Sequence, residues 1–201
     1  MRWIEIFHYF FNAVTSQRSS GVVATNYSKL AIKLQNAEDN DDVQVVFNEL
    51  KKFILEKIPD EDEFVVKFTE LEYSSKKTKD KSIVKYTLAN LIPKTHAALN
   101  VDQEKLTIEH ILPESDIKSN PNANISNIGN LLLIDKTVNG EELKNKKPIE
   151  KILILKQKEY PFSEFDSNEI FNPWDNLKID IRAKKIASFI YQSLKKEIEF
   201  N

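Results

Sequence analysis

The sequence predicts a mainly α-helical protein that contains one short two-stranded hairpin followed by a helix. The helical part is indicated by apolar side chains that recur at helical spacing over residues 43–58 and again over residues 179–198. The hairpin is indicated by two short β-prone runs, Leu106–Ile108 and Leu131–Ile134, separated by a polar stretch. We therefore expect one small sheet flanked by N- and C-terminal helices.

Residues 1–100 are predicted to form a helical N-terminal region. Asp42 contributes to an acidic first turn for the helix over residues 43–58, and Pro59 stops that helix. Pro93 ends another helix, and residues 73–79 form a polar loop rich in lysine and serine. The helices expected in this region cover residues 2–16, which are rich in aromatic side chains, and residues 43–58, 64–71 and 80–92.

Residues 101–201 are predicted to form a second region, because the pattern changes after Asn100. The first strand leads directly into Glu109 and His110, and residues 114–127 form a long loop with several asparagines. Helices are expected to follow the second strand over residues 135–147, 149–157 and 179–198.

The composition excludes several classes of function. A chain of 201 residues without cysteine has no disulfide, no cysteine-bound zinc and no thiol catalysis, which fits a reducing, cytoplasmic location. Three histidines are too few for a histidine-rich metal cage, and three glycines are too few for a phosphate-cradling loop. The longest aliphatic runs are too short to span a membrane, and Glu5 and His8 argue against a signal peptide.

The charge distribution is uneven although the net charge is only −2. Residues 38–72 hold 12 acidic side chains against 4 lysines, which is typical of the solvated face of helices. Residues 136–158 hold 7 lysines against 3 glutamates, so this segment is basic. A basic segment is also a common solvated face, but this one follows the residues described next.

Four polar residues converge if the two short strands pair as a hairpin: Glu109, His110, Asn130 and Asn139. Carboxylate and carboxamide oxygens suit Mg²⁺, and an imidazole can take a proton from water near neutral pH. This set is what a one-metal phosphodiesterase needs, because the metal stabilises charge on the phosphate and the leaving oxygen. The lysines placed to meet flanking phosphates are Lys144, Lys146, Lys147 and Lys151.

A structural interpretation of the same residues stays open at this point. A single histidine after a strand is more often a hydrogen-bonded structural residue than a catalytic one. Asparagines beside a strand usually form turns or caps. His8 and His96 receive no functional role, and the N-terminal aromatic residues are interpreted as helix-packing core.

The motifs resemble a known family over roughly residues 80–195. They are TIEHILP at residues 107–113, IGNLLLI at residues 128–134, Asn139, Asn145 and a terminal helix after Trp174 that carries Arg182. Together they resemble the HNH-like nuclease module at the C-terminal end of GmrSD-type restriction enzymes. The resemblance implies a ββα-metal (His-Me finger) core within residues 101–201.

The resemblance also implies a role for each site residue. His110 would be the general base, and Asn130 would brace the loop between the strands and so hold His110 in its catalytic orientation. Glu109 and Asn139 would bind Mg²⁺ or Mn²⁺. Carboxamide oxygen at the third HNH position, where many relatives have histidine, suits Mg²⁺ better than Zn²⁺. The residues expected to support these ligands or contact phosphates are Asn145, Lys147 and Lys151.

The predicted function is that of a metal-dependent DNA endonuclease in a bacterial restriction or anti-phage defence system. The resemblance implies a further partner, a separate or missing N-terminal nucleotide-dependent recognition domain, and implies no membrane. One alternative is a catalytically inactive nucleic-acid-binding or complex-forming module that retains the HNH fold. Another is a structural helical adaptor whose asparagine-rich loop is accidental.

Overall fold

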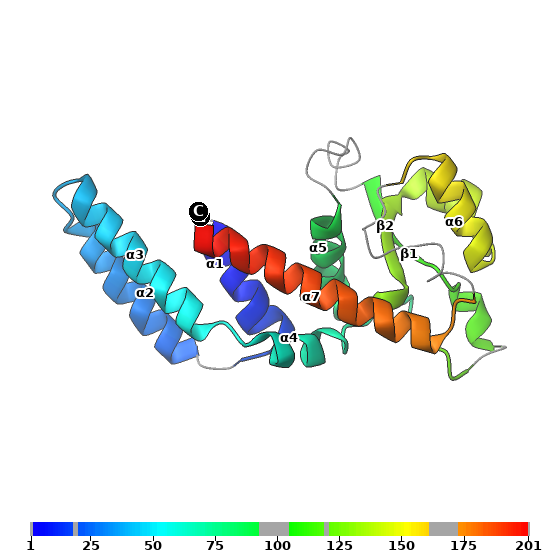
Figure 1. The fold of residues 1–201 in the computed structure, drawn as a ribbon, viewed down its shortest axis with the longest axis horizontal. Helices are drawn as coiled ribbons and strands as arrows, with labels where there is room; N and C mark the ends of the chain where they lie inside the picture. The colour runs from blue at the N-terminus through cyan, green and yellow to red at the C-terminus, as the bar shows by residue number, and fades with distance from the viewer. Residues whose placement is uncertain (1, 18–19, 93–104, 119–120, 161–172, 201) are drawn as a thin grey trace. The chain divides into compact units, whose positions relative to one another are not determined.

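A computed structural model describes residues 2–17, 20–92, 105–118, 121–160 and 173–200 of the chain. These residues are mainly helical and contain one two-stranded antiparallel sheet, as the sequence predicts (Figure 1). The chain forms two compact units, Met1–Phe64 with Tyr191–Asn201, and Val65–Ile190. The domain boundary expected near residue 100 lies outside the described residues.

The first unit is built from helices. They are α1 (Arg2–His8), the π-helix η1 (Tyr9–Val14), α2 (Ser20–Gln35), α3 (Asn40–Lys57), the first part of α4 (Glu61–Phe68) and the last part of α7 (Asn176–Phe200). Within this unit, α2 and α3 lie side by side (Figure 1). None of the helices in the described part of the chain is both long enough and apolar enough to cross a membrane.

The helix predicted over residues 43–58 is confirmed as α3. It begins after Asp39, whose carboxylate accepts hydrogen bonds from the backbone N–H groups of Asp41 and Asp42, both at 2.9 Å. It ends at Lys57, two residues before Pro59. Its apolar stripe is buried at Val46, Leu50, Phe53 and Ile54.

The aromatic side chains near the N-terminus form the core of this unit, as the sequence predicts. Phe7, Phe10 and Phe64 are fully buried, and the rings of Phe10 and Phe64 meet edge to face at 5.0 Å. The single helix expected over residues 2–16 changes to a π-helix at Tyr9. The N–H of Thr15 bonds to the carbonyl of Phe10, five residues back, and its hydroxyl donates to the same carbonyl at 2.9 Å.

The second unit contains the hairpin and the helices around it. Its other elements are α5 (Lys81–Leu91), β1 (Leu106–His110), the 3₁₀-helices η4 (Glu114–Lys118) and η5 (Ile128–Asn130), β2 (Leu131–Asp135), the π-helix η6 (Val138–Leu143) and α6 (Pro148–Gln157). Both predicted strands are confirmed. The helix expected over residues 135–147 is shorter, because η6 ends at Leu143 and Lys144 then takes a φ of 35°.

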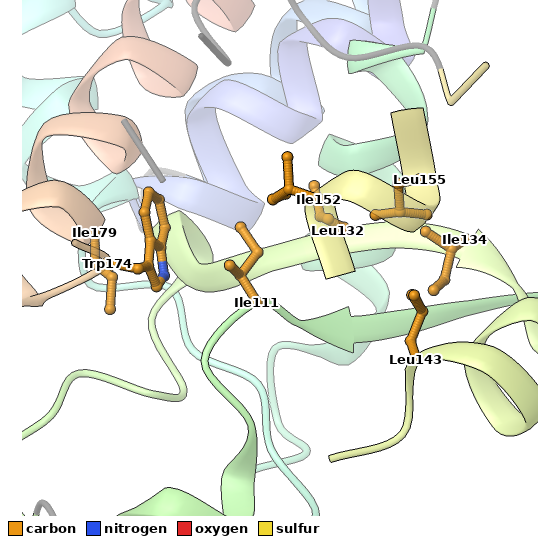
Figure 2. Close-up of a cluster of buried hydrophobic side chains, with 8 residues drawn as sticks. All are labelled: Ile111, Leu132, Ile134, Leu143, Ile152, Leu155, Trp174 and Ile179. Carbon is orange, nitrogen blue, oxygen red and sulfur yellow. The ribbon is translucent and has the colours of Figure 1, made fainter. Parts of the chain in front are cut away.

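The hairpin register decides which side chains share a face. Leu106 pairs with Asp135, Glu109 with Leu132, and His110 with Leu131. Leu132 and Ile134 lie in one apolar cluster with Ile152 and Leu155 of α6 (Figure 2), while α5 packs against the same strand. Because directly paired residues of an antiparallel sheet share a face, Glu109 faces α6 and His110 faces the other way. The rest of the apolar cluster is Ile111, Leu143, Trp174 and Ile179.

The first part of α7 approaches the turn before β2 very closely. A Cβ atom on Gly129 would lie 2.0 Å from the carbonyl oxygen of Ile179 and 3.0 Å from the backbone nitrogen of Ala183. Arg182 of α7 is 1 % exposed and donates from Nη1 to the carbonyl oxygens of Gly129 at 3.0 Å and Leu131 at 2.9 Å. Only glycine allows this contact between backbones.

We therefore expect Gly129→Ala to lower the free energy of unfolding by about 3 kcal/mol, the upper end of the usual range for overpacking. The colliding atoms are backbone, which cannot move aside as a flexible side chain can. Urea unfolding followed by circular dichroism measures the change. Gly140→Ala is the matched control, because a Cβ there meets no atom within 4 Å. Equal effects of the two substitutions would contradict the proposed close approach.

Candidate active site

A cavity of about 220 Å³ lies in the second unit beside the end of β1. Five residues of the predicted site line it: Glu109, His110, Asn139, Asn145 and Lys151. The remaining lining residues are Pro113, Glu114 and Lys144. The hairpin therefore brings together side chains that stand as many as 42 positions apart in the sequence.

Glu109 is buried on the α6 side of the hairpin and is paired with a buried lysine. The ammonium of Lys151 binds Oε1 of Glu109 and donates to the carbonyl oxygen of His110 at 2.6 Å. Lys151 is 1 % exposed and Glu109 is 7 % exposed. Charges this deeply buried are stable only when paired and hydrogen-bonded, so each of these two residues requires the other.

The imidazole of His110 is held by a backbone carbonyl from a distant segment. Its Nε2 lies 2.9 Å from the carbonyl oxygen of Tyr73. A carbonyl can only accept a hydrogen bond, so Nε2 carries the proton and Nδ1 is the basic nitrogen of the neutral ring. The Tyr73 ring stacks on the imidazole with centroids 6.1 Å apart, and Oε1 of Glu114 lies 3.5 Å from Nε2.

The segment that carries Tyr73 is itself tied to the rest of the unit. The N–H of Tyr73 donates to the carbonyl of Ser126 at 2.8 Å. Ser75 donates its N–H and its hydroxyl to the two carboxylate oxygens of Glu114, at 2.7 and 2.6 Å. Sequence reasoning missed Tyr73, Ser75 and Glu114. The one sequence feature that could have indicated a role in the site is the position of Glu114, four residues after His110 and directly after a proline.

Asn130 is fully buried and uses its whole hydrogen-bonding capacity. Oδ1 accepts from the N–H of Leu112 and from Nε1 of Trp174, both at 2.8 Å. Nδ2 donates to the carbonyl oxygens of Leu112 at 2.9 Å and Ile125 at 2.7 Å. These bonds fix the chain just after His110, whereas Tyr73 fixes the imidazole itself.

The turn after η6 shapes the second part of the cavity wall. Asn139 of η6 is half-buried and lines the cavity. The positive φ of Lys144 turns the chain so that Lys144 and Asn145 line it too. Lys147 is exposed at the start of α6, outside the lining, where its N–H donates to the Glu150 carboxylate at 2.9 Å. Lys151, one turn further along α6, is buried and does not join the exposed lysines.

No group of three or more histidine, aspartate or glutamate side chains that could hold a metal ion occurs in the described part of the chain. The oxygen donors that the cavity offers a cation are those of Glu109, Asn139, Glu114 and Asn145. The metal ligands predicted from the sequence are two of these, the buried carboxylate of Glu109 and the carboxamide of Asn139, and water would supply the others.

Comparison with known proteins agrees with the motifs. A family model described as "GmrSD restriction endonucleases, C-terminal domain" matches residues 58–189 of the 201-residue chain. This range contains the hairpin, the cavity and most residues of the second unit. No curated protein and no solved structure matches the chain.

We expect Lys151→Met to lower the free energy of unfolding by about 3–5 kcal/mol, because it leaves the Glu109 carboxylate buried without a counter-charge. The double variant Glu109→Gln with Lys151→Met should recover much of this loss, since neither charge remains. Denaturant unfolding of the single and double variants measures the coupling between the two sites.

The control is Lys158→Met, which removes a surface pair with Glu142 at 2.8 Å. Exposed pairs contribute at most about 1 kcal/mol. A Lys151→Met variant no less stable than Lys158→Met would show that the buried pair does not hold this region together.

Proposed function

This chain belongs to the family of GmrSD restriction endonuclease C-terminal domains, and from that premise we propose that it is a metal-dependent DNA endonuclease of a bacterial restriction or anti-phage defence system. The observation that carries the proposal is the single cavity shared by an imidazole, a carboxylate and a carboxamide, those of His110, Glu109 and Asn139. These are the groups needed to activate water and to hold a hard cation beside a phosphate.

His110 is the general base in this proposal. Its Nε2 is occupied by the Tyr73 carbonyl, so Nδ1 is the nitrogen able to take a proton from the attacking water. The stacked Tyr73 ring and the hydrogen bond together restrict rotation of the imidazole. A base held in one orientation needs no rearrangement when the substrate arrives.

The donor atoms in the cavity fit Mg²⁺ or Mn²⁺. Both ions favour oxygen ligands, and Mg²⁺ commonly takes only one or two from protein and keeps several waters, for which the cavity has room. Lys151 holds Oε1 of Glu109, so the proposed ligands are the other carboxylate oxygen and the carboxamide oxygen of Asn139. When bound, the metal would stabilise negative charge on the scissile phosphate and on the leaving oxygen.

DNA is proposed to lie along the exposed lysines that follow the hairpin, Lys144, Lys146 and Lys147. Their ammonium groups can contact phosphates on either side of the cleaved bond. Lys151 is too deeply buried for this surface. Its proposed role is to hold the Glu109 carboxylate and the carbonyl of His110 in position, and Asn145 supports the adjoining wall.

One observation favours a second candidate function, a nucleic-acid-binding module without catalysis. Lys151 already neutralises the Glu109 carboxylate, which reduces the attraction of the site for a cation. The test is nicking of supercoiled plasmid by the purified protein as Mg²⁺ or Mn²⁺ is titrated. Metal-dependent nicking supports the endonuclease, whereas salt-sensitive DNA binding without cleavage at any metal concentration supports the binding module.

His110→Ala should reduce the nicking rate by at least about a hundredfold, because it removes the proposed base. Divalent-metal binding should remain, since the proposed ligands are unchanged. The control is His8→Ala, which removes a histidine from the first unit and should leave nicking unchanged. Nicking by His110→Ala at close to the wild-type rate would exclude His110 as the base.

Substitutions at Asn139 test the proposed ligand. Asn139→Ala should weaken metal binding, so that excess Mg²⁺ or Mn²⁺ partly restores nicking. Asn139→His supplies an imidazole nitrogen, which suits Mn²⁺ or Ni²⁺ better than Mg²⁺. This variant should keep more activity than Asn139→Ala and prefer the softer ion. If the two variants behave alike with every metal, Asn139 is not a ligand.

A further inference from the structure

We propose that residues 76–81, the loop before α5 and the first residue of α5, form a second DNA-contacting segment. In it, Lys76, Lys79 and Lys81 bind phosphates of the strand whose scissile bond enters the cavity. This inference deepens the proposed function, because it concerns the substrate of the same site. It concerns a lysine-rich loop to which the sequence analysis gave no chemical role.

The loop is attached directly to the wall of the cavity that His110 and Glu114 form. Tyr73, at its start, supplies the carbonyl that holds His110. Ser75 donates two hydrogen bonds to Glu114, which lines the cavity. Residues 76–81 follow immediately along the chain, so they begin next to contacts made at the site itself.

The loop is also ordered within itself. The N–H of Ser74 donates to the carbonyl of Lys77 at 2.9 Å. The hydroxyl oxygen of Ser74 accepts from the N–H groups of Lys77 at 3.0 Å and Lys76 at 3.3 Å. This turn holds the backbone while the side chains stay exposed. Lysines on an ordered turn lose less freedom on binding than lysines on an unstructured segment.

The charges of the loop are largely unsatisfied. Residues 76–81 contain 4 lysines and 1 aspartate, a net charge of +3. Lys77 is paired with the carboxylate of Glu72 at 2.7 Å. Within the described ranges, Lys76, Lys79 and Lys81 have no carboxylate partner, so their ammonium groups are available to a polyanion. A row of phosphates is the polyanion that a nuclease site must accommodate.

Lys81 connects this charge to the base. Its ammonium lies 5.8 Å from the centroid of the Tyr73 ring, and the same ring stacks on His110 at 6.1 Å between centroids. A cation, an aromatic ring and the imidazole thus follow one another from the loop to the cavity. A DNA strand entering the cavity would meet the 76–81 loop beside His110, and Lys144–Lys147 beside the wall that contains Asn139.

The experiment measures binding of a short duplex by fluorescence anisotropy at several salt concentrations, with a chelator present so that cleavage plays no part. The triple variant Lys76→Gln, Lys79→Gln, Lys81→Gln should bind at least about tenfold more weakly, and its salt dependence should fall by about 2–3 in slope, roughly 0.9 for each lost phosphate contact. The matched control replaces three exposed lysines of the first unit, Lys29, Lys52 and Lys57, by glutamine. It changes the net charge equally and should leave the slope unchanged.

The inference is overturned if the loop variant keeps the wild-type slope, if it loses no more than the control, or if wild-type protein binds no duplex. Circular dichroism confirms that each variant is folded, and the single variant Lys76→Gln, expected to reduce the slope by about 1, replaces the triple variant if that one unfolds. Plasmid nicking tests the proposed function separately. If wild-type protein never nicks plasmid but the loop variant loses slope relative to it, the proposed catalysis is refuted and the second DNA-contacting segment is supported.

Discussion

The carboxamide of Asn130 is the constraint on which the rest of the second unit depends. It is fully buried, and its oxygen and nitrogen each make two hydrogen bonds, to the backbone of Leu112 and Ile125 and to the indole of Trp174. Leaving a buried polar group without a hydrogen bond costs about 1–3 kcal/mol, so these bonds stabilise the unit. One side chain therefore ties together the end of β1, the long loop and the chain that leads into α7. No aspartate or leucine could do the same, because neither can both donate two and accept two bonds.

Apolar packing and charge together position the site around Asn130. Ile152 and Leu155 of α6 lie in the cluster with Leu132 and Ile134 (Figure 2). This packing brings the ammonium of Lys151 to Oε1 of Glu109. Burial strengthens the attraction between the two charges but removes their hydration, so both can be buried only while α6 keeps them in contact. The same α6 packing that buries apolar area thus determines where the carboxylate of the site points.

The cavity lies where three segments meet that are far apart in the sequence. Residues 73–75 hold the imidazole and Glu114, and the hairpin carries Glu109 and His110. The π-helix η6 and the turn after it add Asn139 and Asn145. Exposed lysines follow the first and the third of these segments, so the proposed substrate strand would be bound on both sides of the reacting phosphate. The family match over residues 58–189 covers all three of these segments.

The sequence alone determined the elements and the chemistry available to them, because helical periodicity, proline stops and short β-prone runs act over a few residues. The stripe over residues 43–58, the two strands and the terminal helix are local patterns of this kind. The EHILP and GNL strings contain Glu109, His110 and Asn130 of the candidate site. The family resemblance implied that Asn130 braces the loop between the strands and orients His110. The bonds of its carboxamide to Leu112, Ile125 and Trp174 came only from the structure. Only the tertiary structure decided that Lys151 is buried against Glu109, that the Tyr73 carbonyl holds His110, and that Gly129 must leave room for α7. These facts depend on contacts between residues 37 to 54 positions apart, and such contacts follow from how whole elements pack, which no local pattern records.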